Sequence, residues 1–436
     1  MKNTFKKRFI GSALILTLIL TSLFSLSSCG NMSYGGVTDA EINEYGELVI
    51  FYDNGLQQNL GVISNSTTNL TVENYGGDSS SAASKGLVSA VTVTSNFEKT
   101  VKNSYGGMFP GFGGSTIQQY SSEGSGVIYK LDRESGSAFI ITNYHVVYDS
   151  SSNTDDGISD DIDVYLYGRE YEDLAISATY VGGSLYYDIA VLYVENAEIL
   201  KNSVYNSVEI ANSDNVCVGD TAIAIGNPEG YGISASLGIV SVNSEYITMT
   251  VADGASTVSF RVIRVDTAVN SGNSGGGLYN DKGELIGIVN AKIVDETVEN
   301  IAYAIPATVA SAVAENIIDN CYGKENNTVM RAILGVTLGI SDSHAVINDD
   351  GSVSIKEKVK ISEISQGSPA EGILKVGDVV KSITLNGQTK EITRRYHIID
   401  EMLNARVGDK VYIAVERDGN EITVEIVIDN DCIVKY

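Results

Sequence analysis

The central two hundred residues consist of short apolar runs separated by turn-forming residues, and this rhythm restricts the fold more than any other feature. The runs are rich in β-branched and aromatic side chains, with Gly, Ser, Asn and Asp between them from about residue 85 to 300. They include Leu87–Thr94, Phe139–Thr142, Ile162–Tyr167, Ile189–Val194, Ala222–Ile225, Tyr246–Val251, Phe260–Val265 and Leu285–Val289. Because no long helical period interrupts them, the pattern predicts an all-β sandwich or barrel.

One helix and a second set of strands are expected after this region. A helix fits Pro306 to about Ile318, with proline near the first turn, where its missing amide is tolerated. The polar run 320–328 indicates a linker, and further strands with one helical stretch at His397–Asn404 follow it. Since 436 residues exceed one ordinary core, we expect a mainly β protein with domains at residues 81–322 and 328–436.

The N-terminus has the composition of a targeting segment. Four basic residues among the first eight precede a mostly apolar run from Phe9 to Leu26. Small residues then lead into Cys29, an ending that resembles a bacterial lipobox. Residues 1–29 are therefore expected to be a lipoprotein-type signal peptide, with Cys29 lipidated as the mature N-terminus. The alternative is an uncleaved signal anchor, and both interpretations place the remaining residues outside the cytoplasm.

Residues 30–80 indicate a surface tether that contains one short hairpin. Glu47–Asp53 and Leu56–Val62 flank Asn54-Gly55, a pair that suits a type I′ turn. An isolated hairpin is marginally stable unless it packs on something. We assign it no function.

The charge balance argues against binding to nucleic acid. The formal net charge is −26, whereas a phosphate backbone requires clustered Lys and Arg. Anionic lipid would also repel the chain, so membrane attachment should be covalent or by insertion. Besides Cys29, the odd set Cys217, Cys321 and Cys432 forms no disulfide framework, although a single bridge among them stays open.

Three segments carry the residue types of a serine nucleophile, its base and an orienting acid. They are Ile141–Val147 with His145, Tyr187–Leu192 with Asp188, and Asp266–Leu278 with Ser274. A serine hydroxyl is a weak nucleophile and needs a base within hydrogen-bond reach, which a third group orients. The order His, Asp, Ser is that of chymotrypsin-type proteases. The sequence therefore predicts a serine protease without a metal, nucleotide or organic cofactor.

Other chemistries fit the sequence poorly. An α/β-hydrolase carries its acid and histidine after the nucleophile, but only His344 and His397 follow Ser274, both in the last hundred residues. Three scattered histidines without a His-Glu-x-x-His motif give no zinc site. One acidic stretch contains Asp155, Asp156, Asp160, Asp161 and Asp163. Because it lacks the ligand spacing of a calcium loop, we interpret it as a solvated insertion.

The ordered motifs resemble those of the HtrA family of serine proteases. The matching runs are Thr-Asn-Tyr-His-Val-Val, Asp-Ile-Ala-Val-Leu, Gly-Asn-Ser-Gly-Gly and Ala-Tyr-Ala-Ile-Pro. The resemblance covers about residues 85–430 and implies a chymotrypsin-like double β-barrel protease domain followed by a PDZ domain, a small α+β fold. It makes His145 the general base and then acid, Asp188 the group that orients its imidazole, and Ser274 the residue that forms the acyl-enzyme.

The same resemblance places an oxyanion hole at the backbone amides of Gly272, Asn273 and Ser274, where negative charge develops during the reaction. Glycine suits this loop, because the chain must turn tightly and approach the substrate closely. One departure is Gly277, where the family usually has proline. It removes no catalytic group.

Substrate selectivity is only partly legible. Ala268 stands six residues before the nucleophile, where trypsin-like enzymes place an acid to hold Lys or Arg. The resemblance therefore implies an apolar S1 pocket for small aliphatic side chains, and we place Val289, Asn290 and Ala291 around it. The glycine-rich segment 106–114 corresponds to a regulatory loop of the family or, alternatively, to an ordinary surface loop.

The last hundred residues resemble a PDZ domain. The run that starts at Ser368-Pro-Ala and continues to Gly377-Asp378 matches the family pattern. Ile333, Leu334, Gly335 and Val336 then fit the carboxylate-binding loop, whose amides receive a peptide C-terminus while the peptide adds as a strand. The alternative is a generic α+β domain in which Gly335 makes an ordinary turn.

Together these features predict an endopeptidase that cleaves exposed or unfolded polypeptides on the outer face of a bacterial cell membrane. The PDZ domain would recruit substrate or sense C-terminal peptides, and the family resemblance implies a homo-oligomer, commonly a trimer. One rival is a non-catalytic chaperone or scaffold with the same fold, against which the intact His145, Asp188 and Ser274 count. The other rival is a protease held inactive, whose oxyanion hole forms only on activation.

Overall fold

The computed structural model describes residues 37–42, 47–52, 57–62, 79–102, 115–170, 172–291, 301–349 and 351–435. The chain forms two compact units, residues 1–73 and 74–436. The expected signal peptide with Cys29 and the glycine-rich segment 106–114 lie outside the described residues.

The smaller unit contains a three-stranded antiparallel sheet. Its strands are β1 (Val37–Ile42), β2 (Glu47–Tyr52) and β3 (Gln57–Val62), in that order across the sheet. β2 and β3 pair antiparallel on either side of Asn54-Gly55, as expected for the hairpin. β1 adds to the free edge of β2 and was not anticipated, because its sequence Val-Thr-Asp-Ala-Glu-Ile carries a weak strand signal.

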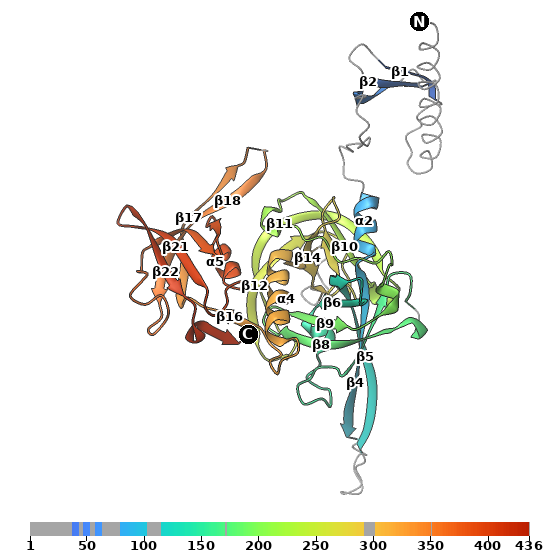
Figure 1. Ribbon diagram of the computed structural model, residues 1–436, viewed down its shortest axis with the longest axis horizontal. Helices are drawn as coiled ribbons and strands as arrows, with labels where there is room; N and C mark the ends of the chain where they lie inside the picture. Colours follow the sequence, from blue (N-terminus) through green and yellow to red (C-terminus); the bar gives the residue numbers. More distant parts are fainter. Residues whose placement is uncertain are drawn as a thin grey trace. The chain divides into compact units, whose positions relative to one another are not determined.

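The first of two closed barrels in the larger unit follows a short helix, α2 (Ser79–Leu87). Its strands are β4 (Ala90–Lys102), β5 (Ser115–Asp132), β6 (Ser137–Thr142), β7 (Asp161–Leu166), β8 (Ile176–Ser184) and β9 (Ile189–Val194). They close in the order β4-β5-β6-β9-β8-β7. β4 and β5 stay paired up to Lys102 opposite Ser115 and continue beyond the barrel as a two-stranded ribbon (Figure 1).

The second barrel is built in the same way from the next part of the chain. Its strands are β10 (Thr221–Gly226), β11 (Ser234–Thr250), β12 (Thr257–Val265), β13 (Gly277–Tyr279), β14 (Leu285–Val289) and β15 (Ala302–Pro306). They close in the order β10-β11-β12-β15-β14-β13. One hydrophobic cluster joins the two barrels, since Val127 and Ile141 of the first share it with Ile225 and Ile288 of the second.

The helix expected from Pro306 to about Ile318 is confirmed as α4 (Ala307–Cys321). Pro306 stands at its N-cap with a φ of −54°, which already suits a helix start. Val313 and Ile317, one turn apart, are fully buried in the cluster that joins the barrels. In contrast, α2 was missed, because residues 79–87 are mostly Ser and Ala and Leu87 was assigned to a strand that begins only at Ala90.

The C-terminal part forms a separate sheet with its own core. Its order is β17 (Val336–Ile347), β18 (Val353–Ile364), β19 (Val379–Leu385), β21 (Lys410–Arg417) and β22 (Asn420–Val427), and β20 (Gln388–Glu391) pairs with β19. The helix α5 (Tyr396–Glu401) overlaps the helical stretch expected around His397–Asn404, but it begins one residue earlier and ends three residues earlier. β16 (Met330–Ala332) pairs with β23 (Ile433–Lys435), the last strand of the chain.

The observed architecture is mainly β, with two antiparallel barrels followed by a small α+β module, as the sequence predicted. No helix among the described residues has the length and apolar character that a membrane crossing requires.

Candidate active site

Both barrels contribute to one constellation of polar side chains. The first barrel supplies His145, on the four-residue helix α3 (Tyr144–Val147) directly after β6, and Asp188, directly before β9. The second barrel supplies Ser274, in the loop between β12 and β13. Although they lie up to 129 positions apart in sequence, these residues are joined by two contacts of hydrogen-bond length. One joins Asp188 to His145, and the other joins His145 to Ser274.

The three side chains form a continuous line of hydrogen bonds. Asp188 Oδ2 lies 2.7 Å from His145 Nδ1, and His145 Nε2 lies 2.9 Å from Ser274 Oγ. Asp188 and Ser274 are 4% and 5% exposed, so water screens their contacts little. With Nδ1–H donating to the carboxylate, Nε2 is the acceptor that faces the serine hydroxyl.

Asp188 is held by further donors from two other segments. The backbone N–H of His145 donates to Asp188 Oδ1 at 3.0 Å, and Asn290 Nδ2 donates to Oδ2 at 2.7 Å. Asn143 Nδ2 donates to the backbone carbonyl of Asp188 at 2.8 Å. Asp188 has a φ of +51°, a conformation that a non-glycine residue keeps only where its surroundings over-determine it. These contacts supply that constraint.

The loop from Ser271 to Gly275, where the oxyanion hole is expected, has a defined backbone orientation. The Ser271 carbonyl accepts from the Glu229 N–H at 2.8 Å. Because a trans peptide directs its C=O and N–H to opposite sides, the Gly272 N–H points away from Glu229. Across the described part of the chain, neither the Gly272 nor the Ser274 N–H has a backbone acceptor outside regular elements. The expected contribution of Asn273 needs correction, because its N–H donates to the Asn270 carbonyl at 3.1 Å.

Glycine is required at two positions of this loop by close backbone contacts. Gly272 has a φ of +90°, and a Cβ there would lie 2.2 Å from the Asn227 carbonyl oxygen. At Gly275 (φ +86°) a Cβ would lie 2.1 Å from the Ser125 carbonyl oxygen. Gly277 has another explanation, because a Cβ there would lie 2.4 Å from the ring of Tyr279. Tyr279 is buried, and its hydroxyl oxygen lies 3.2 Å from Ser89 Oγ. The bulky tyrosine therefore occupies the space that a side chain at 277 would need.

The four residues expected around the S1 pocket have different surroundings. Val289 is 1% exposed and packs in the core of the second barrel, while the buried Asn290 side chain contacts Asp188. Ala268 is exposed, and the Ala291 N–H donates to Ser274 Oγ at 3.3 Å. Only Ala268 and Ala291 of this set therefore have exposed or partly exposed side chains near the nucleophile loop.

The expected carboxylate loop precedes the free edge of the C-terminal sheet. Gly335 has a φ of +69°, and a Cβ there would lie 2.2 Å from the Ser368 side chain, so this turn needs glycine. The Ile333 N–H is already bonded to the Cys432 carbonyl at 2.8 Å. A narrow apolar pocket follows the loop along β17 and α5, and its lining includes Leu334, Val336, Leu338, Ile361 and Ile398.

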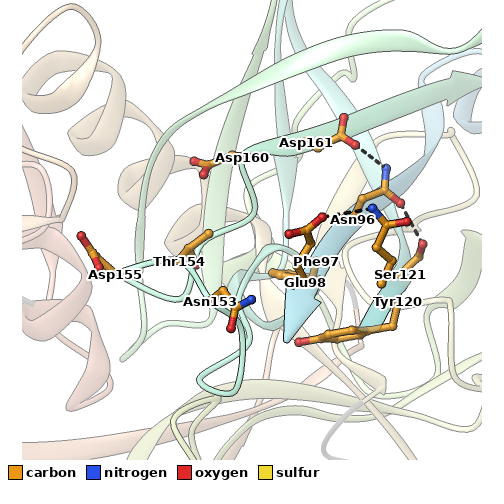
Figure 2. Close-up of a pocket in the computed structure, with 11 residues that line it drawn as sticks. Asn96, Phe97, Glu98, Tyr120, Ser121, Asn153, Thr154, Asp155, Asp160 and Asp161 are labelled. Atoms are coloured by element: carbon orange, nitrogen blue, oxygen red, sulfur yellow. Dashed lines mark hydrogen bonds between the residues drawn. The ribbon is translucent and has the colours of Figure 1, made fainter. Parts of the chain in front are cut away.

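An open pocket of about 790 Å³ lies between the β4–β5 ribbon and the acidic stretch (Figure 2). Phe97 and Tyr120 stack there with ring centroids 5.5 Å apart, and the carboxylates of Glu98, Asp155, Asp160 and Asp161 surround it. No group of His, Cys, Asp and Glu within the described ranges has an arrangement suited to a metal ion. The acidic stretch thus lines a solvated pocket, and none of His145, Asp188 and Ser274 is among its lining residues.

Comparisons with known proteins agree with this architecture. Residues 124–288 match the trypsin-like peptidase domain family, and residues 333–428 match the PDZ domain family. The chain is 31% identical over 379 residues to serine protease Do-like HtrA of Lactococcus lactis, covering 83% of this chain and 85% of that protein. It is also 31% identical over 319 residues to the periplasmic pH-dependent serine endoprotease DegQ of Escherichia coli, covering 72% and 60%.

Among solved structures, the HtrA-type protease AlgW with a decapeptide shares 25% identity, with a TM-score of 0.49 over 80% of this chain and 98% of that chain. The fold and the sequence relatives define a chymotrypsin-like serine endopeptidase with a C-terminal PDZ domain. The chain belongs to the HtrA family of serine proteases.

Two polar residues of this site were not identified from the sequence as contributors. Asn143 stands two residues before His145 in the quoted motif, but its contact with the Asp188 backbone depends on the fold. Ser125, between Gly124 and Gly126 on β5, carries no catalytic pattern of its own, yet its hydroxyl donates to the Gly272 carbonyl at 2.7 Å. Only the three-dimensional arrangement brings either residue to the site.

Proposed function

We propose that His145, Asp188 and Ser274 are the catalytic triad of this endopeptidase. The supporting observation is the unbroken line Asp188–His145–Ser274, with contacts of 2.7 and 2.9 Å. His145 accepts the Ser274 proton as Oγ attacks the peptide carbonyl, and it then donates that proton to the leaving amine. Asp188 keeps Nδ1 protonated and stabilises the imidazolium. Water hydrolyses the resulting acyl-enzyme by the reverse sequence of proton transfers.

The oxyanion of each tetrahedral intermediate is stabilised by the N–H groups of Gly272 and Ser274. The orientation of the Ser271 carbonyl toward Glu229 supports this assignment, because the opposite orientation would direct a carbonyl oxygen at the developing charge. The same observation favours a constitutively formed hole over one that forms only on activation. For S1, Ala268 and Ala291 remain the proposed residues, with small aliphatic side chains as the preferred substrates.

The PDZ domain binds the C-termini of polypeptides along the free edge of β17. Gly335 shapes the loop that receives the carboxylate, and the amides of Leu334, Gly335 and Val336 are the proposed donors. The apolar side chains of Val336 and Leu338 on β17 and of Ile398 on α5 favour a terminal aliphatic side chain at this edge. Ile333 contributes through its position at the start of the loop, since its own N–H is engaged by Cys432.

The substrates are exposed or unfolded polypeptides outside the cytoplasm. Relatives described as periplasmic endoproteases support this location. The basic and apolar residues before Cys29 support a lipoprotein signal, which would anchor the mature chain on the outer face of a bacterial membrane. A homo-oligomer, with the trimer as the family's common form, completes the proposal. The domain boundaries 81–322 and 328–436 are proposed with it.

Cleavage of a reduced, unfolded protein by the detergent-solubilised full chain tests the triad. Ser274→Ala should abolish cleavage to below about 10⁻³ of the native rate while the thermal unfolding midpoint stays unchanged. C-terminal peptides added in the same assay test the PDZ assignment. The effect of these peptides on the native chain is compared with their effect on Gly335→Val, in which the carboxylate loop is altered. Unchanged cleavage by folded Ser274→Ala would refute the triad, and an intact chain without cleavage would favour the chaperone or scaffold.

A further inference from the structure

Ser125 lies on β5 of the first barrel, yet it contacts both residues that supply the oxyanion-hole amides. Its hydroxyl donates to the Gly272 carbonyl at 2.7 Å, and its backbone N–H donates to the Ser274 carbonyl at 2.7 Å. The residue is 0% exposed. Both contacts cross from the first barrel to the nucleophile loop of the second.

The direction of the hydroxyl hydrogen bond is fixed by its other partner. The Asn227 N–H donates to Ser125 Oγ at 2.8 Å, so the hydroxyl acts as acceptor there. A hydroxyl has one proton, and the Gly272 carbonyl is the acceptor that receives it. The two hydrogen bonds therefore run in one direction, from the Asn227 N–H to the Ser125 hydroxyl and from that hydroxyl to the Gly272 carbonyl. No other hydroxyl orientation satisfies all three groups.

Close backbone packing leaves this bridge little freedom. A Cβ on Gly226 would lie 2.8 Å from Ser125 Oγ, and a Cβ on Gly275 would lie 2.1 Å from the Ser125 carbonyl oxygen. Thr142 Oγ1 also donates to that carbonyl at 2.7 Å. Ser125 is thus held on several sides and can act as a fixed reference for the loop.

Two successive carbonyls of the oxyanion loop are therefore held by groups outside it. Glu229 N–H holds the Ser271 carbonyl at 2.8 Å, and Ser125 Oγ holds the Gly272 carbonyl. A rotation of the peptide between Ser271 and Gly272 would replace the Gly272 N–H in the hole with a carbonyl oxygen. Holding the carbonyls on both sides of the Gly272 Cα opposes that rotation, because φ and ψ of Gly272 are then both constrained.

We propose that Ser125 is a positioning residue that keeps the Gly272 amide directed into the oxyanion hole. It touches neither substrate nor the triad side chains and acts through the backbone of Gly272. This inference rests on the proposed function, because it concerns the hole that serves Ser274. Its effect belongs to the transition state, where the oxyanion forms, and hardly to the binding of the uncharged ground state.

Ser125→Ala in the full chain removes the hydroxyl and leaves the backbone contact with Ser274 in place. With an internally quenched peptide that carries valine at P1, we expect kcat to fall about 10- to 100-fold, less than or equal to the loss of an oxyanion donor itself. KM should stay within about twofold of the native value, and the pH–rate profile should keep its midpoint. Ser125→Cys keeps the shape with a weaker donor and should give an intermediate kcat.

A peptide aldehyde of the same sequence separates positioning from a general structural role. It forms a hemiacetal with Ser274 whose oxygen takes the place of the oxyanion, so its affinity should fall by the same factor as kcat/KM. Ser95→Ala is the matched control, since Ser95 is 0% exposed on the adjacent β4 and its hydroxyl has no partner within the described residues. The control should keep native kinetics.

Native kcat and aldehyde affinity in folded Ser125→Ala would overturn the inference, as would a rise in KM with kcat unchanged. If Ser125→Ala does not fold, Ser125→Cys decides by the same two measurements. Ser274→Ala run in parallel distinguishes the two proposals. Cleavage by that variant would refute the triad, whereas its inactivity beside a native Ser125→Ala would refute only the role of Ser125.

Discussion

Two buried aspartates, Asp188 at the triad and Asp400 on α5, are held by opposite kinds of partner. Asp188 accepts from the His145 N–H and the Asn290 amide, besides the imidazole. Asp400 accepts from Arg261 Nη1 at 2.5 Å, and the Arg261 side chain is only 2% exposed. The first carboxylate is thus oriented by dipoles and the second is paired with a full charge.

The Asp400 region joins the protease domain to the PDZ domain. Arg261 on β12 also pairs with Asp214 at 2.7 Å, and Lys390 on β20 reaches Asp214 at 2.6 Å. Burial raises the pKa of Asp400 to about 6, although Arg261 opposes that rise. For Asp214, burial acts upward as well, but Arg261 and Lys390 outweigh it and its pKa is lowered.

The difference reflects what each carboxylate has to do. In the proposed mechanism, Asp188 orients an imidazole whose charge changes during the reaction, and neutral donors fix it without adding a permanent cation beside that imidazole. The Asp214–Arg261–Asp400 cluster only has to hold two domains together, and a buried charge that loses its partner there is strongly unfavourable. Substitutions at Asp188 should therefore change rate more than stability, and substitutions at Arg261 the reverse.

Of the substitutions that test this comparison, Asp188→Asn should give the largest effect on rate. Asparagine tolerates the φ of +51° at this position, so the fold should be kept. Its amide cannot hold Nδ1 protonated, and the other tautomer turns Nε2 into a donor toward Ser274. We expect kcat to fall about 10³- to 10⁴-fold at neutral pH. Peptide hydrolysis together with urea unfolding measures both quantities, and a loss of stability that matches the loss of rate would break the comparison.

Arg261→Met should give the largest effect on stability. It leaves Asp214 and Asp400 buried without their shared cation, which costs about 3–5 kcal/mol in the free energy of unfolding. Arg264→Met on the same strand is the matched control, because its pair with Glu245 is about one-third exposed and worth at most about 1 kcal/mol. Urea titrations compare the two variants. Equal losses would show that the buried cluster is no stronger than an exposed pair.

The sequence predicted the triad because its three residue types lie in ordered motifs with turn-forming neighbours. The β-branched runs between Gly, Ser, Asn and Asp predicted an all-β sandwich or barrel. The double barrel and the PDZ domain followed from the resemblance to the HtrA family. The pairing of β4 with β7, which closes the first barrel, is a long-range contact without a local signature.

Side-chain direction was the part that sequence reasoning could not reach. Asn290 was expected around the S1 pocket, but its side chain lies in the second barrel and donates to Asp188 of the first. Ser125 is 147 residues from Gly272, and nothing in the run Gly-Ser-Gly indicates a partner at that distance. Such contacts depend on how two closed sheets meet, which a single sequence does not encode as a pattern.

Asn290→Leu tests whether neutral donors orient Asp188, and its expected effect on rate is smaller than that of Asp188→Asn. It removes a donor to a buried carboxylate, a hydrogen bond worth about 1.5–3 kcal/mol, so kcat/KM should fall about 10- to 100-fold. Asn316→Leu is the matched control, since Asn316 is equally buried and its Nδ2 donates to the Met330 carbonyl at 2.8 Å. The control should lose stability and keep its rate. A native rate in Asn290→Leu would show that the His145 contacts alone orient Asp188.

His397→Gln should give the smallest change in stability. It tests the charged cluster around Asp400 through the pH dependence of that stability. Burial lowers the pKa of His397 to about 4, so its contribution to stability is present above pH 6.5 and is lost as pH falls toward 4. Asp400 acts in the opposite sense, because its raised pKa gives a contribution that is present near pH 4 and lost as pH rises through about 6. The charges of Asp214, Lys390 and Arg261 act on His397, but the largest cause of its lowered pKa is burial.

The two contributions therefore oppose each other in the native chain, and replacing His397 leaves that of Asp400 alone. Relative to the native protein, the variant should gain on the order of 2 kcal/mol in the free energy of unfolding between pH 7 and 4. Urea titrations at pH 7, 5.5 and 4.5 measure this difference. A difference that does not change with pH would mean that His397 titrates alike in the folded and unfolded chains. The pH dependence of stability at this interface would then come from Asp400 and Arg261. The difference between Asp400 and Asp188 would be explained by the charge of Arg261 alone.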